Sequence, residues 1–322
     1  MTFKVAIVGA GAIGTVVAAS LAAAGRSVTV VARGARREEL VNRGLRFIER
    51  GLERTVFPRI AELSDVGQAD LVIMATKAHS LAEVLPEVVS AMAPEAHLVP
   101  MVNGIPWWYF LGSQAEAPVR SVDPDGKLLP LINGHRILGC VVYSRASIRD
   151  QVATSHGPQF MKLGSVIGPP PVQVAEFFSD AGIRVGVETD IRREVWRKLV
   201  LNAATNPVSA LMGATLEQLA SDPSLSECVC GIAQEVLDLS VLFGYHLDLA
   251  VDSIREQVQR GGRFATSMLQ DISAGRHPEF GAVIDAPLEL ASVAAHPMPR
   301  LQQIASLLRA KVRLGETVSA AE

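Results

Sequence analysis

The first 33 residues, MTFKVAIVGAGAIGTVVAASLAAAGRSVTVVAR (Met1–Arg33), decide how this chain begins to fold. An apolar run at 3–8 leads directly into the glycine turn Gly9-x-Gly11-x-x-Gly14, then an alanine-rich stretch, then a second apolar run at 27–31. Buried parallel strands have such continuous apolar runs, and a glycine turn between strand and helix is typical of dinucleotide-binding folds. The stretch therefore predicts a strand–turn–helix–strand unit whose turn faces a ligand at the carboxyl edge of a parallel sheet.

The rest of the chain divides into two regions. Strand and helix signals alternate as far as residue 188, with strands expected at 70–76, 97–102, 137–144, 151–163 and 183–187 and helices at 81–92 and 172–181. Beyond that point apolar residues recur every three or four positions, which predicts helices at 192–205, 216–220, 225–243, 247–259, 267–274, 282–294 and 300–314. The predicted fold class is α/β: a Rossmann-type N-terminal domain (1–188) followed by an all-α C-terminal domain (189–322).

Composition limits the classes of function. The chain has 322 residues, 49% hydrophobic and 20% charged, which fits a globular protein with a large core. A net charge of −3 and the lack of an apolar run near ~20 residues favour neither a nucleic-acid nor a membrane partner. Three cysteines, an odd and sparse set, argue against a disulfide framework. We therefore expect reduced, buried cysteines, no metal site and a cytoplasmic protein.

The glycines of the first turn have separate roles. Gly9 permits the tight turn, Gly11 lets the backbone approach a pyrophosphate, and Gly14 lets the helix pack closely on the strand. The helix N-terminus adds amide donors and a positive dipole, both of which favour phosphate groups. A glycine turn with no nucleotide is the alternative, but the strands on both sides favour a dinucleotide.

The end of the second strand bears on the choice of nucleotide. NAD enzymes usually place Asp or Glu there to bind the ribose hydroxyls, whereas this chain has Ala32, Arg33 and Gly34. An arginine can form a paired, charge-assisted contact with a 2′-phosphate. The pattern favours NADP(H) over NAD(H), with a solvated turn arginine as the alternative.

Polar residues follow two later strands. Lys77 comes after the strand at 70–76, where it can contact a phosphate or a substrate carboxylate, or simply begin the next helix at the surface. Asn103-Gly104 comes after the strand at 97–102, where an amide can hydrogen-bond cofactor or substrate. Taken alone, Asn-Gly is also an ordinary turn.

The helical region contains an unusual polar stripe. Lys198, Asn202 and Asn206 are four residues apart, so on a helix they share one face. Polar side chains in an apolar helix are costly to bury unless they are paired, which favours a functional face over a solvated one. Ser267 and Glu279 belong to a second polar cluster. Singly, they would be a helix N-cap and a first-turn acid.

Taken together, these motifs resemble the ketopantoate reductase (2-dehydropantoate 2-reductase) family over nearly the whole chain. The matching features are Gly9-x-Gly11-x-x-Gly14, Ala32-Arg33-Gly34, Lys77, Asn103-Gly104, Trp196-x-Lys198-x-x-x-Asn202-x-x-x-Asn206-Pro207, Ser267-Met268-Leu269-Gln270-Asp271 and Arg276-x-x-Glu279.

The resemblance implies NADPH-dependent reduction of ketopantoate to pantoate, a step of pantothenate biosynthesis, with the second domain serving substrate binding and dimerisation. It makes Lys198 the general acid and Glu279 the acid that orients the reacting hydroxyl, with Asn202, Asn206 and Ser267 as substrate contacts. The expected partner is a small 2-keto acid, and the apolar helical domain would suit a homodimer. The predicted cofactor-binding residues are Gly9, Ala10, Gly11, Ala12, Ile13, Gly14, Arg33, Lys77 and Asn103.

The sequence departs from the family pattern on the substrate side. Gly281 stands where members often have an acid, Asp285 where a glycine is common, and Leu216 where an asparagine is common. Three alternatives remain open: reduction of another small 2-keto acid, a non-catalytic NADP(H)-binding sensor with no use for Lys198, and a 6-phosphogluconate- or glycerol-phosphate-type dehydrogenase.

Overall fold

The computed structural model describes residues 2–114 and 116–319. The chain forms two compact units. The first unit comprises Met1–Val102, Trp107–Pro118 and Asp123–Ile191, and the second comprises Asn103–Pro106, Val119–Val122 and Arg192–Glu322. Two short segments of the first half of the chain, 103–106 and 119–122, therefore belong to the second unit.

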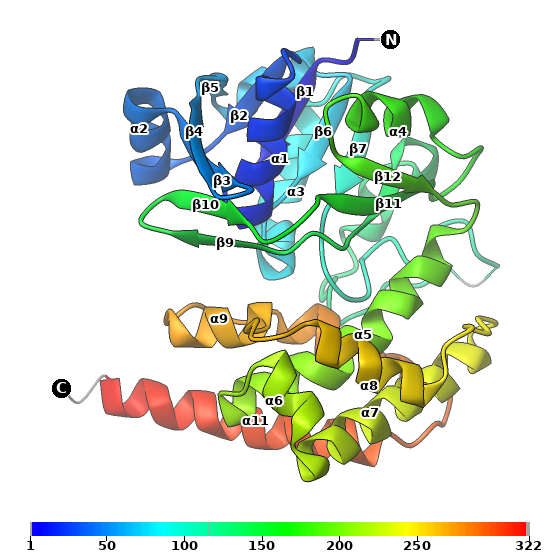
Figure 1. The fold of residues 1–322 in the computed structure, drawn as a ribbon. Coiled ribbons are helices and arrows are strands. Elements are labelled where there is room, and N and C mark those ends of the chain that lie inside the picture. The colour runs from blue at the N-terminus through cyan, green and yellow to red at the C-terminus, as the bar shows by residue number, and fades with distance from the viewer. Residues whose placement is uncertain (1, 115, 320–322) are drawn as a thin grey trace. The chain divides into compact units, whose positions relative to one another are not determined.

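The first unit is built on a five-stranded parallel sheet in the order β5-β2-β1-β6-β7 (Figure 1). The strands are β1 (Val5–Val8), β2 (Val28–Val31), β5 (Arg59–Ala61), β6 (Leu71–Met74) and β7 (His97–Pro100). Helices α1 (Ala12–Ala23), α2 (Gly34–Arg43) and α3 (Leu81–Ala91) connect them. This confirms the predicted Rossmann-type domain, since the apolar runs are the buried central strands.

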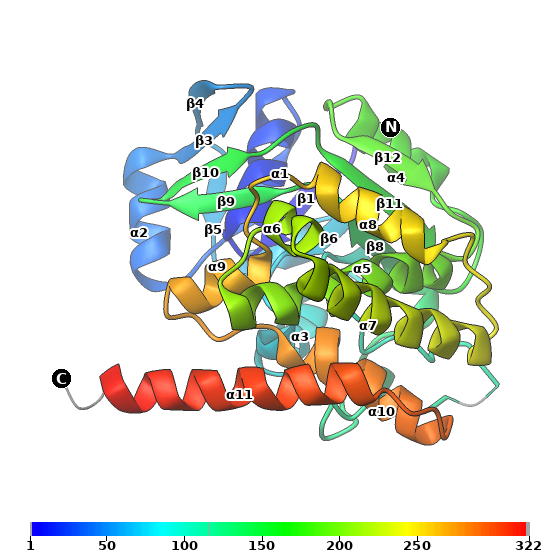
Figure 2. The same cartoon turned by 60° about the horizontal axis from the view of Figure 1, so that its bottom comes forward.

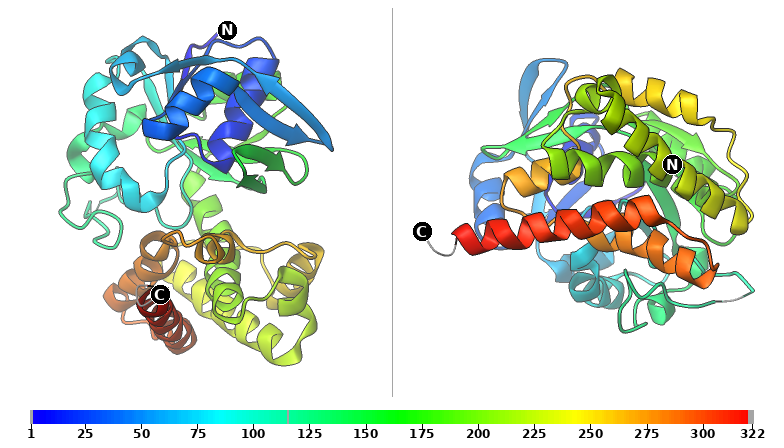
Figure 3. Two further views of the ribbon diagram at one scale, coloured as in Figure 1. Left: turned by 90° about the vertical axis from the view of Figure 1, so that its left-hand side faces the viewer. Right: turned by 90° about the horizontal axis from the view of Figure 1, so that it is seen from below.

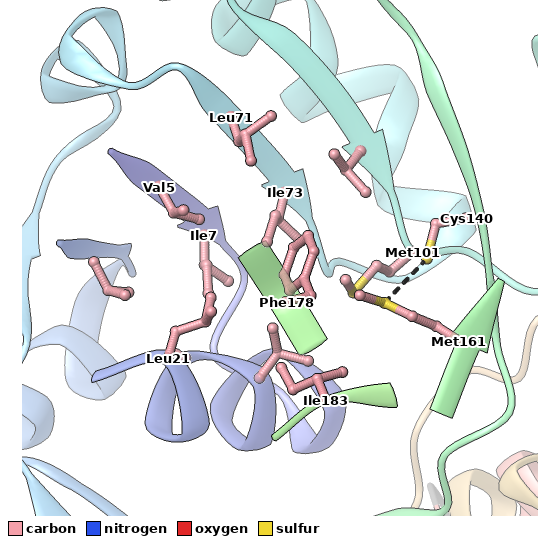
Figure 4. Packing of buried hydrophobic residues seen from close by; sticks show 14 of the residues in the cluster. Val5, Ile7, Leu21, Leu71, Ile73, Met101, Cys140, Met161, Phe178 and Ile183 are labelled. Carbon is pink, nitrogen blue, oxygen red and sulfur yellow. Dashed lines mark hydrogen bonds between the residues drawn. The ribbon is translucent and has the colours of Figure 1, made fainter. Parts of the chain in front are cut away.

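Burial of the central strands explains their composition. Every residue of β1 and β6 is buried, so neither strand alternates apolar and polar side chains. Ile7 pairs in register with Val30 on one side and Ile73 on the other. Figure 4 shows Ile7 and Ile73 in the core together with Phe178, which comes from α4 (Val172–Ser179). Helix α4, which comes late in the sequence of the first unit, thus contributes to the same core as the first strands.

Two smaller sheets complete the first unit. One has the order β4-β3-β10-β9 and the other β12-β11-β8. The single strand expected at 151–163 is two strands in different sheets, and the strands at 45–49, 52–56 and 146–149 have no counterpart in the prediction. The bounds are β3 (Leu45–Glu49), β4 (Leu52–Val56), β8 (Leu138–Val142), β9 (Ala146–Arg149), β10 (Val152–Ser155), β11 (Phe160–Ser165) and β12 (Arg184–Val187).

From Arg192 onward, the described part of the second unit contains only helices and loops, as predicted (Figure 2). The helices are α5 (Ile191–Met212), α6 (Leu216–Ser221), α7 (Pro223–Leu242), α8 (Val251–Arg260), α9 (Ser267–Ser273), a π-helical turn (Gly281–Asp285), α10 (Ala286–Val293) and α11 (Pro299–Ser319). Figure 3 (right) shows α10 in orange leading into the long C-terminal helix α11 in red.

Helix α5 is longer than expected. The prediction ended it at Thr205, two residues before Pro207, and proline usually breaks a helix. The helix instead continues through Pro207 to Met212. A proline removes only one helical N–H, and the buried neighbours Ala203, Ala204 and Val208 keep the helix packed. The helix that carries Lys198, Asn202 and Asn206 therefore extends beyond the last of these residues.

Cysteine burial differs from the expectation in part. All three cysteines are free, but only Cys140 is buried, whereas Cys228 and Cys230 on α7 are half-buried. Partial burial raises the pKa of the Cys228 thiol, which keeps it in its less reactive form. Within the described residues, no helix combines the length and apolarity needed to cross a bilayer.

Candidate active site

The glycine turn of the first unit is fixed by close packing at two positions. Gly9 has φ +108°, and a Cβ there would lie 2.9 Å from the backbone carbonyl of Ala75. A Cβ on Gly14 would lie only 2.1 Å from the carbonyl oxygen of Gly9. A Cβ on Gly11 would meet nothing within 4 Å. Packing therefore demands glycine at positions 9 and 14, whereas Gly11 borders open space.

The start of α1 has the features of an anion site. Gly11 is its N-cap, no side chain caps the helix, and its first turn contains no acid. The backbone donors of the first turn are therefore available to an external acceptor. Nearby, the hydroxyl of Thr76 is buried with no hydrogen-bond partner among the described residues, and its Cγ2 lies 3.0 Å from the Cβ position of Gly9. These features fit the diphosphate of a dinucleotide held by residues 9–14.

Arg33 lies at the position predicted for it. It directly follows Ala32 at the end of β2, and it is the N-cap residue of α2. Its guanidinium pairs with Glu87 of α3 at 2.7 Å, and both side chains are more than half exposed. An exposed pair of this kind is weak, so the guanidinium can exchange Glu87 for another anion at little cost.

A second guanidinium lies beside α1, and it received no role in the sequence interpretation. Arg36 donates to Oε1 of Gln151 at 2.7 Å and to Glu39 at 2.8 Å, and one of its nitrogens lies 3.4 Å from the hydroxyl of Thr15. The Thr15 hydroxyl in turn donates to the carbonyl of Ala10 in the glycine turn. The spacing Arg33-x-x-Arg36 was the only signal available, and Gln151 is too distant in the sequence to be linked to it.

Lys77 also belongs to the first unit. It follows β6 and is the half-buried N-cap residue of a short 3₁₀ turn at 78–80. The preceding residues Ala75 and Thr76 contact the glycine turn. Lys77 is therefore the residue that follows the strand end packed against Gly9.

In the second unit, three predicted site residues form a hydrogen-bonded chain. The ammonium of Lys198 donates to Oδ1 of Asn103 at 2.6 Å, and Nδ2 of Asn103 donates to Oε2 of Glu279 at 3.2 Å. Lys198 comes from α5, Asn103 follows β7, and Glu279 directly precedes the turn of helix at 280–285. Because an ammonium can only donate and a carboxylate can only accept, the amide of Asn103 has one possible orientation between them.

Segment 103–106 is held by backbone contacts. Gly104 has φ +77°, and a Cβ there would lie 2.1 Å from the carbonyl oxygen of Ala282. The N–H of Ile105 donates to that same carbonyl at 2.9 Å. Glycine at 104 therefore allows Asn103 to lie next to the chain that carries Glu279. Glu279 itself is only 8% exposed.

The three predicted substrate residues lie in the same unit but outside this chain of hydrogen bonds. Asn202 and Asn206 follow Lys198 at successive four-residue steps on α5, and Asn206 is buried. Ser267 is exposed at the first turn of α9. The N-cap of that helix is Thr266, which accepts from the N–H of Leu269, so the alternative role of Ser267 as N-cap is wrong. None of the three hydrogen-bonds to the side chains of Lys198, Asn103 or Glu279 in the described part of the chain.

The three departures from the family pattern have structural reasons. A Cβ on Gly281 would lie 2.6 Å from the carbonyl oxygen of Ser121, so no side chain fits there. Asp285 forms an ion pair with Arg309 of α11. Leu216 begins α6 and packs against Gly261. Among residues 2–114 and 116–319, no group of three His, Cys, Asp or Glu side chains has the arrangement of a metal site.

Comparison with known proteins shows the family over most of the chain. Residues 5–167 match the family Ketopantoate reductase PanE/ApbA, and residues 190–312 match its C-terminal family, Ketopantoate reductase PanE/ApbA C terminal. The 2-dehydropantoate 2-reductase of Mesorhizobium japonicum is 35% identical over 316 residues, which cover 95% of this chain and 97% of that protein.

Solved structures share the fold. A putative ketopantoate reductase from Ralstonia solanacearum MolK2 superposes with a TM-score of 0.90 at 30% identity, covering 97% of this chain and 98% of the other. D-mandelate dehydrogenase, in a ternary structure with NADH and anilino(oxo)acetate, superposes with a TM-score of 0.84 over 96% of this chain and 98% of the other. Its identity is 20%, so this second likeness is one of fold alone.

Proposed function

Because the chain is an oxidoreductase that belongs to the ketopantoate reductase family, we propose that it reduces ketopantoate (2-dehydropantoate) to pantoate with NADPH. The observation that carries this proposal is the hydrogen-bonded chain Lys198–Asn103–Glu279. It holds a proton donor, the ammonium of Lys198, in a fixed position next to a buried carboxylate, and a carbonyl reduction needs a proton donor in addition to a hydride source.

In the proposal, the N-terminal region (residues 1–188) binds the cofactor. NADPH, when bound, supplies the hydride. Residues 9–14 hold its diphosphate with backbone amides at the start of α1, and Arg33 exchanges Glu87 for the 2′-phosphate. Lys77 and Asn103 are the remaining proposed cofactor contacts, and each lies three residues beyond the end of a strand of the parallel sheet, β6 and β7 respectively.

The second region (residues 189–322) is proposed to hold the substrate and supply the proton. Lys198 donates a proton to the carbonyl oxygen as negative charge develops there, so that C=O becomes CH–OH. Glu279 accepts a hydrogen bond from the reacting hydroxyl and orients it. Asn202, Asn206 and Ser267 bind the rest of the 2-keto acid. Asn103 holds the ammonium of Lys198 in place through the 2.6 Å hydrogen bond.

A second candidate is the same reaction on another small 2-keto acid. It is favoured by Gly281, where the carbonyl of Ser121 occupies the space that a family acid would need. The altered groups lie on the proposed substrate side, so they bear on the identity of the acid rather than on the reaction. A non-catalytic NADP(H) sensor would have no need for the pairing of Lys198 with Asn103.

The test is NADPH oxidation with ketopantoate and a panel of 2-keto acids, using wild type and Lys198→Ala. We expect the variant to lose kcat by a factor on the order of 10² or more, because the general acid is gone. Lys127→Ala is the matched control, since Lys127 is an exposed lysine that forms an ion pair with the exposed Asp125 and belongs to neither proposed site. NADPH binding without turnover of any keto acid by the wild type would favour the sensor instead.

The cofactor assignment has its own test. Arg33→Ala should reduce the preference for NADPH over NADH by roughly 10- to 100-fold, in line with ~1.5–3 kcal/mol for a hydrogen bond to a charged group. Arg43→Ala removes the same charge from the exposed last turn of α2 and should leave the preference unchanged. An unchanged preference in Arg33→Ala would show that the assignment to NADP(H) is wrong.

We further propose a cytoplasmic location, on the basis of the free cysteines, and a role in pantothenate biosynthesis through the pantoate product. A homodimer formed by the helical unit is proposed as well.

A further inference from the structure

The carboxylate of Glu289 holds a segment from the first half of the chain. Glu289 lies on α10, and its Oε1 accepts the backbone N–H of Arg120 at 2.7 Å. Its Oε2 accepts both the N–H of Ser121 at 2.7 Å and the hydroxyl of Ser121 at 2.6 Å. Hydrogen bonds to an ionised acceptor are about twice as strong as neutral ones. One half-buried carboxylate thus fastens segment 119–122 to α10 within the second unit.

A second segment, 103–106, packs against the same stretch, 281–289. The missing side chain of Gly281 leaves room for the carbonyl of Ser121, and Ala282 contacts Gly104 and accepts the N–H of Ile105. Segments 119–122 and 103–106 are therefore docked on neighbouring residues of the same stretch. Residues 107–118, which belong to the first unit, lie between these two segments in the sequence. The chain therefore leaves the second unit after residue 106 and returns to it at residue 119.

The sequence explains why Ala282 can accept from outside its helix. In a π-helix the carbonyl of residue i accepts from the N–H of residue i+5, and for Ala282 that residue is Pro287, which has no N–H. The N–H of Ala286 is already bonded to Gly281. The carbonyl of Ala282 is thereby left to the N–H of Ile105. Buried carbonyls require such partners.

These contacts converge on the proposed catalytic groups. Asn103 directly precedes Gly104, and Glu279 lies two residues before Gly281, so both ends of the Asn103–Glu279 hydrogen bond border the docked stretch. We propose that Glu289 is a positioning residue, which fastens segment 119–122 against 281–289 and thereby keeps Asn103 aligned between Lys198 and Glu279. Its kinetic consequence rests on the proposed function, whereas its structural consequence does not.

A carboxylate is specifically suited to this position. Three donors converge on two oxygens, and each donor needs an acceptor. In Glu289→Gln, one oxygen becomes an NH₂ group that faces an N–H, so a backbone donor loses its partner. Leaving such a group unsatisfied costs about 1–3 kcal/mol. In Ser121→Ala only one of the three hydrogen bonds is lost, so the same effect should be smaller.

The first test is hydrogen exchange on the intact protein and does not depend on any substrate. In Glu289→Gln we expect faster exchange of the amides of 119–122 and also of the Ile105 amide, which Glu289 does not touch. Glu227→Gln makes the same charge change at an exposed site on α7 and should alter neither segment. Faster exchange confined to 119–122, or unchanged exchange in both segments, would overturn the proposal.

The second test is kinetic and uses the turnover assay above. Glu289→Gln should lower kcat about tenfold at saturating NADPH, while the Kd for NADPH changes much less, because the proposed cofactor residues 9–14, Arg33 and Lys77 belong to the other unit and Asn103 is the one proposed cofactor contact that the change displaces. An unchanged kcat, or a loss of kcat that only parallels a loss of NADPH binding, would contradict the role of Glu289. If the wild type reduces no keto acid, the proposed function fails, and hydrogen exchange still decides this inference.

Gly281→Ala provides an independent route to the same result. The added Cβ would meet the carbonyl of Ser121 at 2.6 Å, which pushes segment 119–122 away without altering the carboxylate. It should reproduce the faster exchange of Ile105 even if Glu289→Gln folds poorly. Normal exchange of Ile105 in Gly281→Ala would count against docking as the cause.

Discussion

At the residue scale, Asn103 decides how charge is arranged in the proposed active site. Its side chain separates the ammonium of Lys198 from the carboxylate of Glu279 and hydrogen-bonds to both. An amide is the only neutral side-chain group that can accept on one side and donate two hydrogens on the other. Asn103 therefore joins the two charged groups without neutralising either of them.

The isosteric change Asn103→Asp tests this arrangement. It would place a second carboxylate about 3.2 Å from Glu279, where two like charges repel. We expect kcat with ketopantoate to fall about 10- to 100-fold at pH 8, in keeping with ~1.5–3 kcal/mol for a hydrogen bond to a charged group. The ratio to wild type should partly recover as the pH is lowered, because a shared proton relieves the repulsion.

Asn133→Asp is the matched control. Asn133 caps a 3₁₀ turn in the first unit through the N–H of His135, an acceptor role that aspartate can also fill. Its kcat should follow the wild-type pH profile. A loss in Asn103→Asp that does not vary with pH would argue against facing carboxylates.

At the element scale, the turn between β1 and α1 has glycine for two different reasons. Gly14 leaves no room for a side chain, whereas Gly11 borders open space that we propose the diphosphate occupies. Gly14→Ala should lower the free energy of unfolding by about 1–3 kcal/mol, because its Cβ would overlap the carbonyl of Gly9. Gly11→Ala should leave the free energy of unfolding nearly unchanged, because its Cβ meets nothing within 4 Å. It should nevertheless weaken NADPH binding tenfold or more, because the methyl group would stand where the proposed diphosphate approaches.

Denaturant unfolding and NADPH titration of both variants check this pair. Each variant serves as the control for the other, since they differ by three residues in one turn. If Gly11→Ala binds NADPH as tightly as wild type, the diphosphate does not lie over this turn.

Strand β7 carries a group that links stability to pH. Burial lowers the pKa of His97 below its ordinary value of 6.5, the nearby Arg136 lowers it further, and Glu95 opposes them. Because the folded state binds this proton less readily, the unfolded chain holds more protons just below pH 6.5. The contribution of His97 to stability is therefore present above pH 6.5 and lost as the pH falls below it, at no more than ~1.4 kcal/mol per pH unit.

Replacing this histidine should remove that dependence. His97→Gln should flatten the fall in the free energy of unfolding between pH 7 and 5, measured by urea denaturation. His246→Gln, at an exposed position, is the control and should keep the wild-type slope. Equal slopes in all three proteins would mean that His97 contributes nothing to acid sensitivity.

At the scale of the whole molecule, the helical unit exposes apolar side chains that its own core leaves uncovered. Leu307 and Leu314 on α11 are 50% and 69% exposed, and their seven-residue spacing places them on one face of the helix. A stable dimer typically buries about 800 Å² on each partner. We expect a homodimer in which this face of α11 is buried.

Sedimentation equilibrium at micromolar concentration measures the state directly. Leu307→Arg combined with Leu314→Arg should give monomers, because the change would bury two charges without partners. Ser306→Arg adds a charge one residue away on a different face of α11 and should leave the dimer intact. A monomeric wild type would rule out the predicted assembly.

The central parallel strands and the all-helical second region were determined by the sequence alone. Continuous apolar runs mark the central strands, and the three-to-four residue periodicity marks the second unit, because burial acts directly on the pattern of neighbouring residues. The short strands at 45–56 and 146–149 escaped prediction because they are partly exposed and depend on pairing with each other and with 152–155. The continuation of α5 beyond Pro207 depends on packing around that helix, which local preference does not contain.

The sequence also identified Lys198, Asn103 and Glu279 as candidate site residues, whereas only the tertiary structure decided that these three are hydrogen-bonded to one another. Asn103 lies 95 residues from Lys198 and 176 from Glu279, and no spacing rule connects such positions. Their contact follows from Gly104, Ala282 and Pro287, whose backbone geometry docks segment 103–106 on the helical unit. Glu289 carried no motif at all, because its importance comes from two backbone N–H groups that are distant in the sequence. The chemistry of a side chain depends only on its own residue type, but the partners that it contacts depend on the packing of segments that are distant in the sequence.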